Sequence, residues 1–291
     1  MNLWHNYISP TTLNEALLAL RDSPAPAAPI AGGTDLLLDM GQGRHSPATT
    51  IVDLTSVAEM TALELRGTML FIGGAVTLTR IARHPLTAQH AEALVEACDL
   101  IGGPQVRNVA TLGGNVAHAL PAADGTIGLL ALDAVVEIAA LGGSRRLPIA
   151  ELFEGPGKSV LRRGAELIVG FLIPLKGSHE ASAFKRIMRP QGVALPIINL
   201  AVWMRRSRDS IDALRIAAGP SGPTPRRAFA AEQALAGTAY SDAACRLATE
   251  ALLAHATFRT SPRRAGADYR RQLVGSLLQE ALSCAWSRTE E

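Results

Sequence analysis

Two pairs of neighbouring glycines are the residues of this chain best suited to binding a ligand. The first pair lies in AGGTD at 31–35 and the second in TLGGN at 111–115. Because glycine lacks a Cβ atom, its backbone approaches a ligand closely and adopts positive φ angles. Successive N–H groups in such a turn form a concave anion site, which a following helix strengthens. One pair is most often only a tight turn, but two pairs would suffice to hold the two phosphates of a dinucleotide from opposite sides.

Polar side chains accompany each pair. Thr34 and Asp35 fit the N-cap and first turn of a helix, while Thr111 supplies a hydroxyl and Asn115 an amide. With backbone dipoles and such neutral groups available, an anionic ligand needs no cluster of lysines.

Two further polar residues follow the second pair. Asp124 fits the acidic group that accepts ribose hydroxyls in other nucleotide-binding folds. It fits equally well as the N-cap of a helix over 127–132, and the sequence leaves both interpretations open. His118 is placed to face a ligand, although a lone histidine in a loop is more often structural or exposed.

Other chemistry is excluded by spacing. The stretch GPGKS at 155–159 resembles the end of a P-loop, but that motif needs a further glycine where Leu152 stands. The three cysteines are Cys98, Cys245 and Cys284. They are far apart and form no CxxC, which disfavours a disulfide framework, a zinc ribbon and an iron–sulfur ligand set. Since HExxH and GxSxG are also missing, we expect no catalytic residue and no metal site, but a cofactor that itself supplies the chemistry.

The elements that must position these residues follow from hydrophobic spacing. A capping box at 12–15 opens a helix, and short strands at 27–31 and 51–54 complete a small α/β unit. A hairpin over 61–72, helices at 79–83 and 91–101 and strands at 135–140 and 166–173 follow. Beyond residue 178 come strands at 183–188, 197–204 and 211–217, then helices at 227–235, 241–255 and 269–287.

This order predicts an α+β fold with a boundary near residue 176. We expect a first domain over 1–176, divided at about 56 into subdomains 1–56 and 57–176, and a second over 177–291.

The formal charge is +2, from 28 basic and 26 acidic residues, which argues against nucleic-acid binding. No signal peptide and no membrane-spanning segment is recognised, so we expect a soluble, cytoplasmic protein without membrane insertion.

Six stretches resemble a known family. AGGTDLLLDM (31–40) is similar to the first FAD motif of the flavoprotein subunits of molybdenum hydroxylases, and IGGPQVRNVATLGGNVAHALPAAD (101–124) resembles their most specific motif. Further similarity lies at 152–174, 183–190, 222–237 and 269–282. The family includes the medium subunit of carbon monoxide dehydrogenase and the FAD subunits of xanthine dehydrogenases. The resemblance implies a two-subdomain FAD-binding domain of the vanillyl-alcohol-oxidase type, followed by a smaller α+β domain.

The resemblance also implies a role for individual residues. The FAD diphosphate would be wrapped by Ile30, Ala31, Gly32, Gly33, Thr34, Asp35 and Leu36 and contacted from the other side by Thr111, Gly113, Gly114 and Asn115. Asp124 would bind the adenosine ribose, Ile168 would contact the adenine end, and Lys185 would lie near the flavin. Ile101 stands where some relatives have an aromatic residue beside the flavin.

The implied activity is electron transfer within a larger enzyme. A large subunit with molybdopterin would oxidise the substrate, and a small subunit with two [2Fe–2S] clusters would relay electrons to this FAD. The FAD would pass them to an acceptor such as NAD⁺, in a dimer of heterotrimers. The 4-hydroxybenzoyl-CoA subtype is disfavoured because the chain has no cysteine-rich insertion. The alternatives are a self-sufficient FAD oxidoreductase of the same fold and a non-enzymatic scaffold that has lost FAD.

Overall fold

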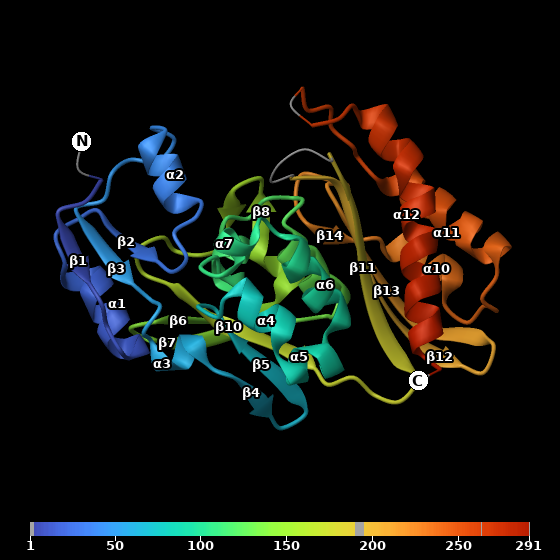
Figure 1. Cartoon of the computed structure of the whole chain (residues 1–291), viewed down its shortest axis with the longest axis horizontal. Helices are drawn as coiled ribbons and strands as arrows, with labels where there is room; N and C mark the ends of the chain where they lie inside the picture. Colours follow the sequence, from blue (N-terminus) through green and yellow to red (C-terminus); the bar gives the residue numbers. More distant parts are fainter. Residues whose placement is uncertain (1–2, 190–194, 263, 291) are drawn as a thin grey trace.

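The computed structural model describes residues 3–189, 195–262 and 264–290. It is an elongated α+β structure in which an N-terminal, a central and a C-terminal unit follow one another along the long axis (Figure 1). The fold class expected from the sequence is therefore confirmed. Among the described helices, none is long and apolar enough to cross a membrane.

The N-terminal unit is a parallel sheet with the strand order β1-β3-β2. Its elements are β1 (Asn6–Ile8), α1 (Leu13–Asp22), β2 (Ala27–Ile30), α2 (Leu36–Gly41) and β3 (Thr50–Asp53). The expected capping box is confirmed, because the Thr12 hydroxyl accepts from the Glu15 amide and the Glu15 carboxylate accepts from the Thr12 amide. Leu17 and Leu20 of α1 pack into a core that also includes Phe71 of the central unit.

The central unit is an antiparallel sheet with the order β4-β5-β10-β6-β7. Its strands are β4 (Leu63–Arg66), β5 (Met69–Gly73), β6 (Val135–Ala140), β7 (Gly143–Pro148) and β10 (Leu167–Pro174), with a small β8 (Phe153–Gly155) and β9 (Lys158–Ser159) hairpin after the 3-10 turn η1 (Ile149–Leu152). The predicted hairpin over 61–72 is confirmed as β4-β5.

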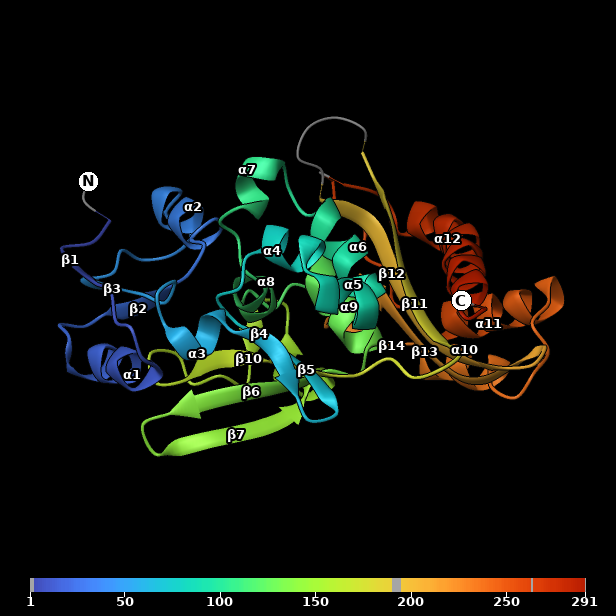
Figure 2. The ribbon, with the colours of Figure 1, turned by 60° about the horizontal axis from the view of Figure 1, so that its bottom comes forward.

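Helices of the central unit gather on one side of this sheet (Figure 2). They are α3 (Ala58–Thr61), α4 (Leu78–Arg83), α5 (Pro85–His90), α6 (Glu92–Leu100), α7 (Pro104–Arg107), α8 (Leu112–Ala117) and α9 (Asp124–Ala131). α9 is buried along its whole length, including Gly125 and Gly128. It packs between α6 and the strands β12 (Pro196–Ser207) and β13 (Ser210–Gly219) of the C-terminal sheet.

The C-terminal unit is an antiparallel sheet with the order β11-β12-β13-β14, followed by three helices. The elements are β11 (Glu180–Met188), β12 (Pro196–Ser207), β13 (Ser210–Gly219), β14 (Arg226–Arg227), α10 (Phe229–Leu235), α11 (Asp242–His255) and α12 (Ala267–Arg288). Both faces of the sheet are covered. Ala183 and Val202 pack in the core beneath the helices, whereas Phe184 and Trp203 belong to the core of the central unit.

The buried helix α9 is held by ion pairs to the C-terminal sheet at both of its ends. At its first residue, Asp124 pairs with Arg186 of β11 at 2.5 Å, and both side chains are buried. Just beyond its last turn, Asp133 lies 3.2 Å from Arg227 and 3.7 Å from Arg215. Because the two ends of one helix are fixed to the same sheet, the central and C-terminal units pack as one body.

Candidate cofactor-binding site

The first glycine pair connects the end of β2 to the start of α2. Gly33 has φ 67°, a conformation that suits glycine. A Cβ atom on Gly32 would lie 2.2 Å from the Val109 carbonyl oxygen, so this position also admits no side chain. The backbone N–H groups of residues 32–35 donate to no acceptor within the described part of the chain. Four successive free donors beside a helix start are the feature expected of an anion site.

The second glycine pair differs from the predicted turn, because Gly113 and Gly114 lie inside helix α8. Thr111 is its N-cap, and its hydroxyl accepts from the Gly114 amide at 3.2 Å. Gly113 is needed for packing, since a Cβ there would lie 2.5 Å from the Gly74 carbonyl oxygen. Gly114 instead is exposed, and a Cβ there would meet only the Thr111 hydroxyl, at 3.2 Å. The expectation of two turns is therefore wrong for the second pair.

The two glycine pairs lie side by side. The segment 109–110, directly before Thr111, is the backbone against which Gly32 packs. The His118 ring also joins them: its Nδ1 lies 3.4 Å from Asp35 and its Nε2 lies 3.9 Å from Asp39, both on the α2 side. His118 is thus neither exposed nor simply a core histidine, but a connection between the two parts of the site.

The charges of this connection reinforce each other. Hydrogen bonding to Asp35 raises the pKa of His118 above its ordinary value, and the same bond lowers the pKa of Asp35. Asp35 occupies the N-cap position of α2, but its side chain makes no cap hydrogen bond. The assignment of Thr34 as the cap is therefore wrong, and the Asp35 carboxylate serves the contact with His118 instead.

Beyond α8 lies a buried polar cluster. Asn115 Oδ1 is buried and has no hydrogen-bond partner among the described residues. It lies against Gly125, where a Cβ would come within 2.8 Å of it. The carboxylate of Asp124 accepts from Arg186 and from Asn199 Nδ2, each at 2.5 Å. Burial raises the pKa of Asp124, against the opposing effect of Arg186.

The start of α9 rules out one of the two interpretations of Asp124 that the sequence left open, that of a helix cap. α9 begins at Asp124 itself and its N-cap is Ala123, so Asp124 is not a helix cap. Arg186 and Asn199 were missed by sequence reasoning. Asn199 carried a signal, because it is the one polar residue in the apolar run PIINLAVWM at 196–204.

Three of the predicted residues lie apart from the two glycine pairs. Ile101 is the C-cap of α6, and Ile168 lies in β10 beside a bulge; both pack in the central core. Lys185 is on the face of β11 that turns toward α12, where its ammonium lies 3.4 Å from Glu280. The alternation of a strand places Lys185 opposite to Phe184 and Arg186, which face the central unit.

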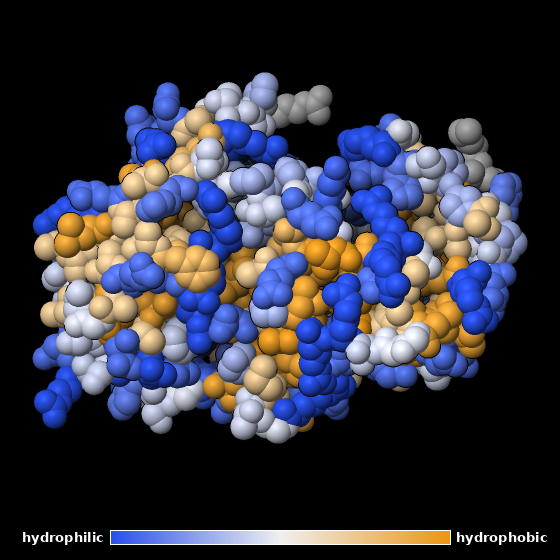
Figure 3. Space-filling view, turned by 180° about the vertical axis from the view of Figure 1, so that it is seen from behind, coloured by the Kyte–Doolittle hydropathy of each residue, from blue (hydrophilic) through white to orange (hydrophobic). Residues whose placement is uncertain are grey.

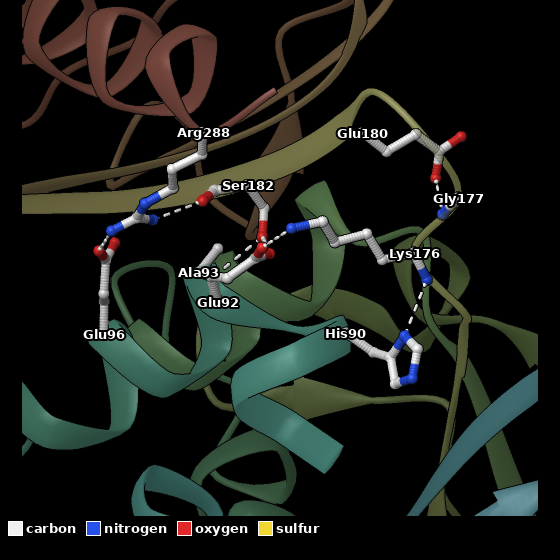
Figure 4. Close-up of polar contacts among 9 residues, drawn as sticks. All are labelled: His90, Glu92, Ala93, Glu96, Lys176, Gly177, Glu180, Ser182 and Arg288. Atoms are coloured by element: carbon white, nitrogen blue, oxygen red, sulfur yellow. Dashed lines mark hydrogen bonds and ion pairs between the residues drawn. The ribbon is translucent and has the colours of Figure 1, made fainter. Parts of the chain in front are cut away.

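A cavity lies elsewhere, at the junction of α6 with the C-terminal unit (Figure 4). It has a volume of about 500 Å³, and none of the predicted residues lines it. Its charged groups satisfy one another: Glu92 accepts from Lys176 at 2.5 Å and from Ser182 at 2.8 Å. Glu96 accepts from the Phe184 amide and binds Arg288. This cluster joins the units rather than offering free groups to a ligand.

Comparison with known proteins gives the class of the fold and site. Residues 3–176 match the family described as FAD binding domain in molybdopterin dehydrogenase, and residues 182–285 match the CO dehydrogenase flavoprotein C-terminal domain. The chain therefore belongs to the FAD-binding flavoprotein family of molybdopterin dehydrogenases. Its cofactor is FAD and it is an oxidoreductase component, as the resemblance of the two motifs implied.

Particular relatives cover almost the whole chain. The xanthine dehydrogenase FAD-binding subunit of Escherichia coli O157:H7 is 32% identical over 280 residues, which are 96% of this chain and 94% of the relative. The nicotine 6-hydroxylase medium subunit of Paenarthrobacter nicotinovorans is 31% identical over 284 residues, 97% of this chain and 98% of the relative. Among solved structures, carbon monoxide dehydrogenase from Hydrogenophaga pseudoflava superimposes with a TM-score of 0.91 at 28% identity, with 98% of each chain covered.

The residues at the two glycine pairs fit this cofactor. FAD carries an anionic diphosphate, and the four free N–H groups at 32–35 are suitable donors for it. The exposed Gly114 leaves room at the start of α8, and the unpartnered Asn115 Oδ1 offers a buried acceptor nearby. The donors available to the diphosphate are thus neutral backbone N–H groups.

Proposed function

We propose that this chain is the electron-transfer subunit of a molybdenum-containing hydroxylase or dehydrogenase. In this proposal a [2Fe–2S] partner subunit delivers electrons to its FAD, and an acceptor such as NAD⁺ removes them. Bound FAD supplies the ability to accept and release one or two electrons. One observation carries the proposal: the free amides at 32–35 lie close to the N-terminus of α8. The contact between Gly32 and the Val109 backbone brings them together.

In this proposal the chain's own residues bind and orient the cofactor. The amides at 32–35 and the first turn of α8 bind the diphosphate, with Ile30 and Leu36 at the ends of the first segment. Asp124, fixed by Arg186 and Asn199, presents its carboxylate to the adenosine ribose. Ile101 and Ile168 give apolar contacts to the rings. The ammonium of Lys185 faces away from the central unit toward Glu280, so Lys185 contributes to the site through its backbone.

Association with partner subunits belongs to the same proposal. Several relatives are named as medium chains or medium subunits, a term that denotes one component of a larger enzyme. Hydrophobic surface gathers in the middle of the face seen from behind (Figure 3), and exposed apolar areas often mark interfaces. We expect a molybdopterin-binding large subunit and a [2Fe–2S] small subunit, in a dimer of heterotrimers in the cytoplasm. The domains would be 1–176, with subdomains 1–56 and 57–176, and 177–291.

The test is reconstitution followed by electron transfer. The purified chain, loaded with FAD, should retain about one flavin per chain and show no turnover of small substrates on its own. Co-expressed with its molybdopterin and [2Fe–2S] chains, it should have its flavin reduced when the substrate of the large subunit is added. Steady-state turnover by the isolated chain would favour the self-sufficient oxidoreductase. A colourless protein after reconstitution would favour the scaffold.

A further inference from the structure

Many arginines of the described chain form ion pairs with carboxylates, while others, such as Arg83, Arg208 and Arg246, form none. The paired arginines include Arg145, Arg186, Arg205, Arg227 and Arg288. Where β11 ends and α12 begins, Arg189, Arg259, Arg264 and Arg270 form no ion pair with any carboxylate of the described chain. These four differ from the other arginines without an ion pair in lying close to one another.

These arginines belong to one contiguous region. Arg189 Nη2 donates to the Arg264 carbonyl oxygen at 3.0 Å, which joins the end of β11 to the loop before α12. Arg270, in the first turn of α12, donates through Nη1 to the Ile197 carbonyl oxygen of β12. Arg270 is almost fully buried, and its Nε has no partner within the described residues. The upper end of Figure 1 shows β11 and the start of α12 side by side.

The positive charge of these arginines is not balanced by nearby negative charge in the described chain. Burial lowers the pKa of Arg264, and the nearby Arg259 lowers it further; burial and then Arg264 and Arg259 do the same for Arg270. Neighbouring residues in the sequence supply no counter-charge, because neither 188–197 nor 256–267 contains an acidic residue. Asp268 is the nearest acidic residue in sequence, but it is exposed and forms no ion pair with these arginines. The N-terminus of α12 adds partial positive charge.

Large apolar side chains are exposed among these cations. Met188 is 41% exposed, Leu195 58% and Tyr269 49%. Arginine, tyrosine and methionine are enriched at protein–protein interfaces, whereas lysine and glutamate are depleted. We call the surface made by Met188, Arg189, Leu195, Arg259, Arg264 and Tyr269 the arginine end. Its combination of arginine, tyrosine and methionine is typical of protein–protein interfaces.

The arginine end adjoins the proposed cofactor site. Arg186, which holds Asp124, also donates to the Met188 sulfur at 2.9 Å, so the two regions share strand β11. A partner bound here is thereby placed next to the residues that orient the cofactor. A negatively charged partner would supply the counter-charge that the described chain lacks.

We propose that the arginine end is the docking surface for an acidic face of the [2Fe–2S] partner subunit. This inference rests on the proposed function, because that function supplies the partner. Complementary charge of this kind steers association and makes the association rate depend on salt. The apolar side chains, once desolvated, slow dissociation.

The test measures association of the FAD-loaded chain with its co-encoded [2Fe–2S] chain by biolayer interferometry. Arg259→Glu with Arg264→Glu should reduce the association rate by about tenfold or more at low ionic strength, and by much less at about 0.5 M salt. The matched control is Arg83→Glu with Arg246→Glu, two exposed arginines elsewhere that form no ion pair among the described residues. Its association rate should stay within about twofold of wild type. Tyr269→Ala should mainly accelerate dissociation.

Two readouts separate failure of the inference from failure of the proposed function. FAD content and melting temperature show whether the variants fold, and Arg259→Gln with Arg264→Gln repeats the test without introducing carboxylates. If wild type binds the [2Fe–2S] chain and both double variants bind equally well, the docking surface is elsewhere and only the inference fails. If wild type binds FAD but no [2Fe–2S] chain, both fail. Binding of pyrophosphate to wild type, lost in the double variant while subunit affinity is unchanged, would assign the arginines to a small anion and overturn the docking proposal.

Discussion

His118 Nδ1 lies 3.4 Å from Asp35 Oδ2, so the helix that carries the second glycine pair is tied to the segment that carries the first. The two residues are 83 positions apart in the sequence (118 − 35). This contact between the two segments depends on charge, because it pairs an imidazole with a carboxylate.

The first prediction concerns pH. Hydrogen bonding to Asp35 raises the pKa of His118 above 6.5, so the stabilisation from His118 is complete below that pH and is lost as the pH rises through the raised value. The pKa of Asp35 is lowered below 3.8, so its contribution is lost only when strong acid protonates it. FAD should therefore dissociate more slowly at pH 6 than at pH 8.5.

His118→Gln should abolish most of this pH dependence, as measured by flavin release over pH 5–9. The effect on unfolding should not exceed about 1 kcal/mol, because both side chains are partly exposed. An unchanged pH profile in His118→Gln would show that the contact does not control retention of the cofactor.

The second prediction separates the two glycines of α8. Gly114→Val should leave the fold intact, since Gly114 is exposed, but should abolish FAD retention, because its side chain fills the space at the helix start. Gly113→Ala should instead destabilise the protein by about 1–3 kcal/mol, because the new Cβ overlaps the Gly74 backbone. Flavin content and urea unfolding distinguish these outcomes, and a Gly114→Val protein with normal flavin content would refute the site.

The third prediction concerns the buried pair of Asp124 and Arg186. Arg186→Met leaves a buried carboxylate without its cation and should cost about 3–5 kcal/mol of unfolding free energy. Asp124→Asn combined with Arg186→Met should recover a large part of that loss, since no charge remains buried.

If the Asp124 carboxylate binds ribose, the double variant should nevertheless bind FAD more weakly, by roughly 1–3 kcal/mol. Chemical denaturation of the apo-protein measures the first effect, and flavin fluorescence titration the second. Wild-type FAD affinity in a stable double variant would limit Asp124 to a structural role.

The fourth prediction concerns Glu96, which accepts from the Phe184 amide at 2.6 Å and binds Arg288 near the end of the chain (Figure 4). Glu96→Gln keeps an acceptor for one partner but removes the ion pair. Hydrogen exchange should accelerate in the last turns of α12 and at the start of β11, while α1 stays unchanged as an internal control. If Glu96→Gln and wild type show the same protection in all three segments, Glu96 does not join the two units.

Sequence patterns predicted the elements with strong periodicity and missed those that depend on context. α1, the β4-β5 hairpin and the strands β11, β12 and β13 follow from apolar spacing and are confirmed, whereas β14 was not predicted. β7 was missed because GSRRLP is exposed and has no apolar alternation; it forms by pairing with β6. α8 was missed because glycine pairs disfavour helices, but capping by Thr111 and packing on Gly74 outweigh that preference.

At the candidate site, the special backbone of its glycines could be predicted from the sequence, but its tertiary contacts could not. Gly32 and Gly33 were recognisable, because close approach and positive φ leave few other residues possible. Arg186 and Asn199 reach Asp124 from strands 62 and 75 residues further along the chain, a distance over which no local pattern extends. The link between His118 and Asp35 is long-range in the same way. Contacts between units are determined by packing, which the sequence does not display.

The C-terminal sheet, covered on both faces, also has a consequence for the order of events during synthesis. Phe184 and Trp203 fill the core of the central unit, and Arg288 completes the contact with Glu96. While residues up to 176 emerge from the ribosome, the apolar surface that awaits these side chains is therefore open. The partners of Asp124, which are Arg186 and Asn199, also lie beyond residue 176. A chain that ends at the unit boundary therefore exposes the apolar surface that Phe184 and Trp203 cover in the complete fold.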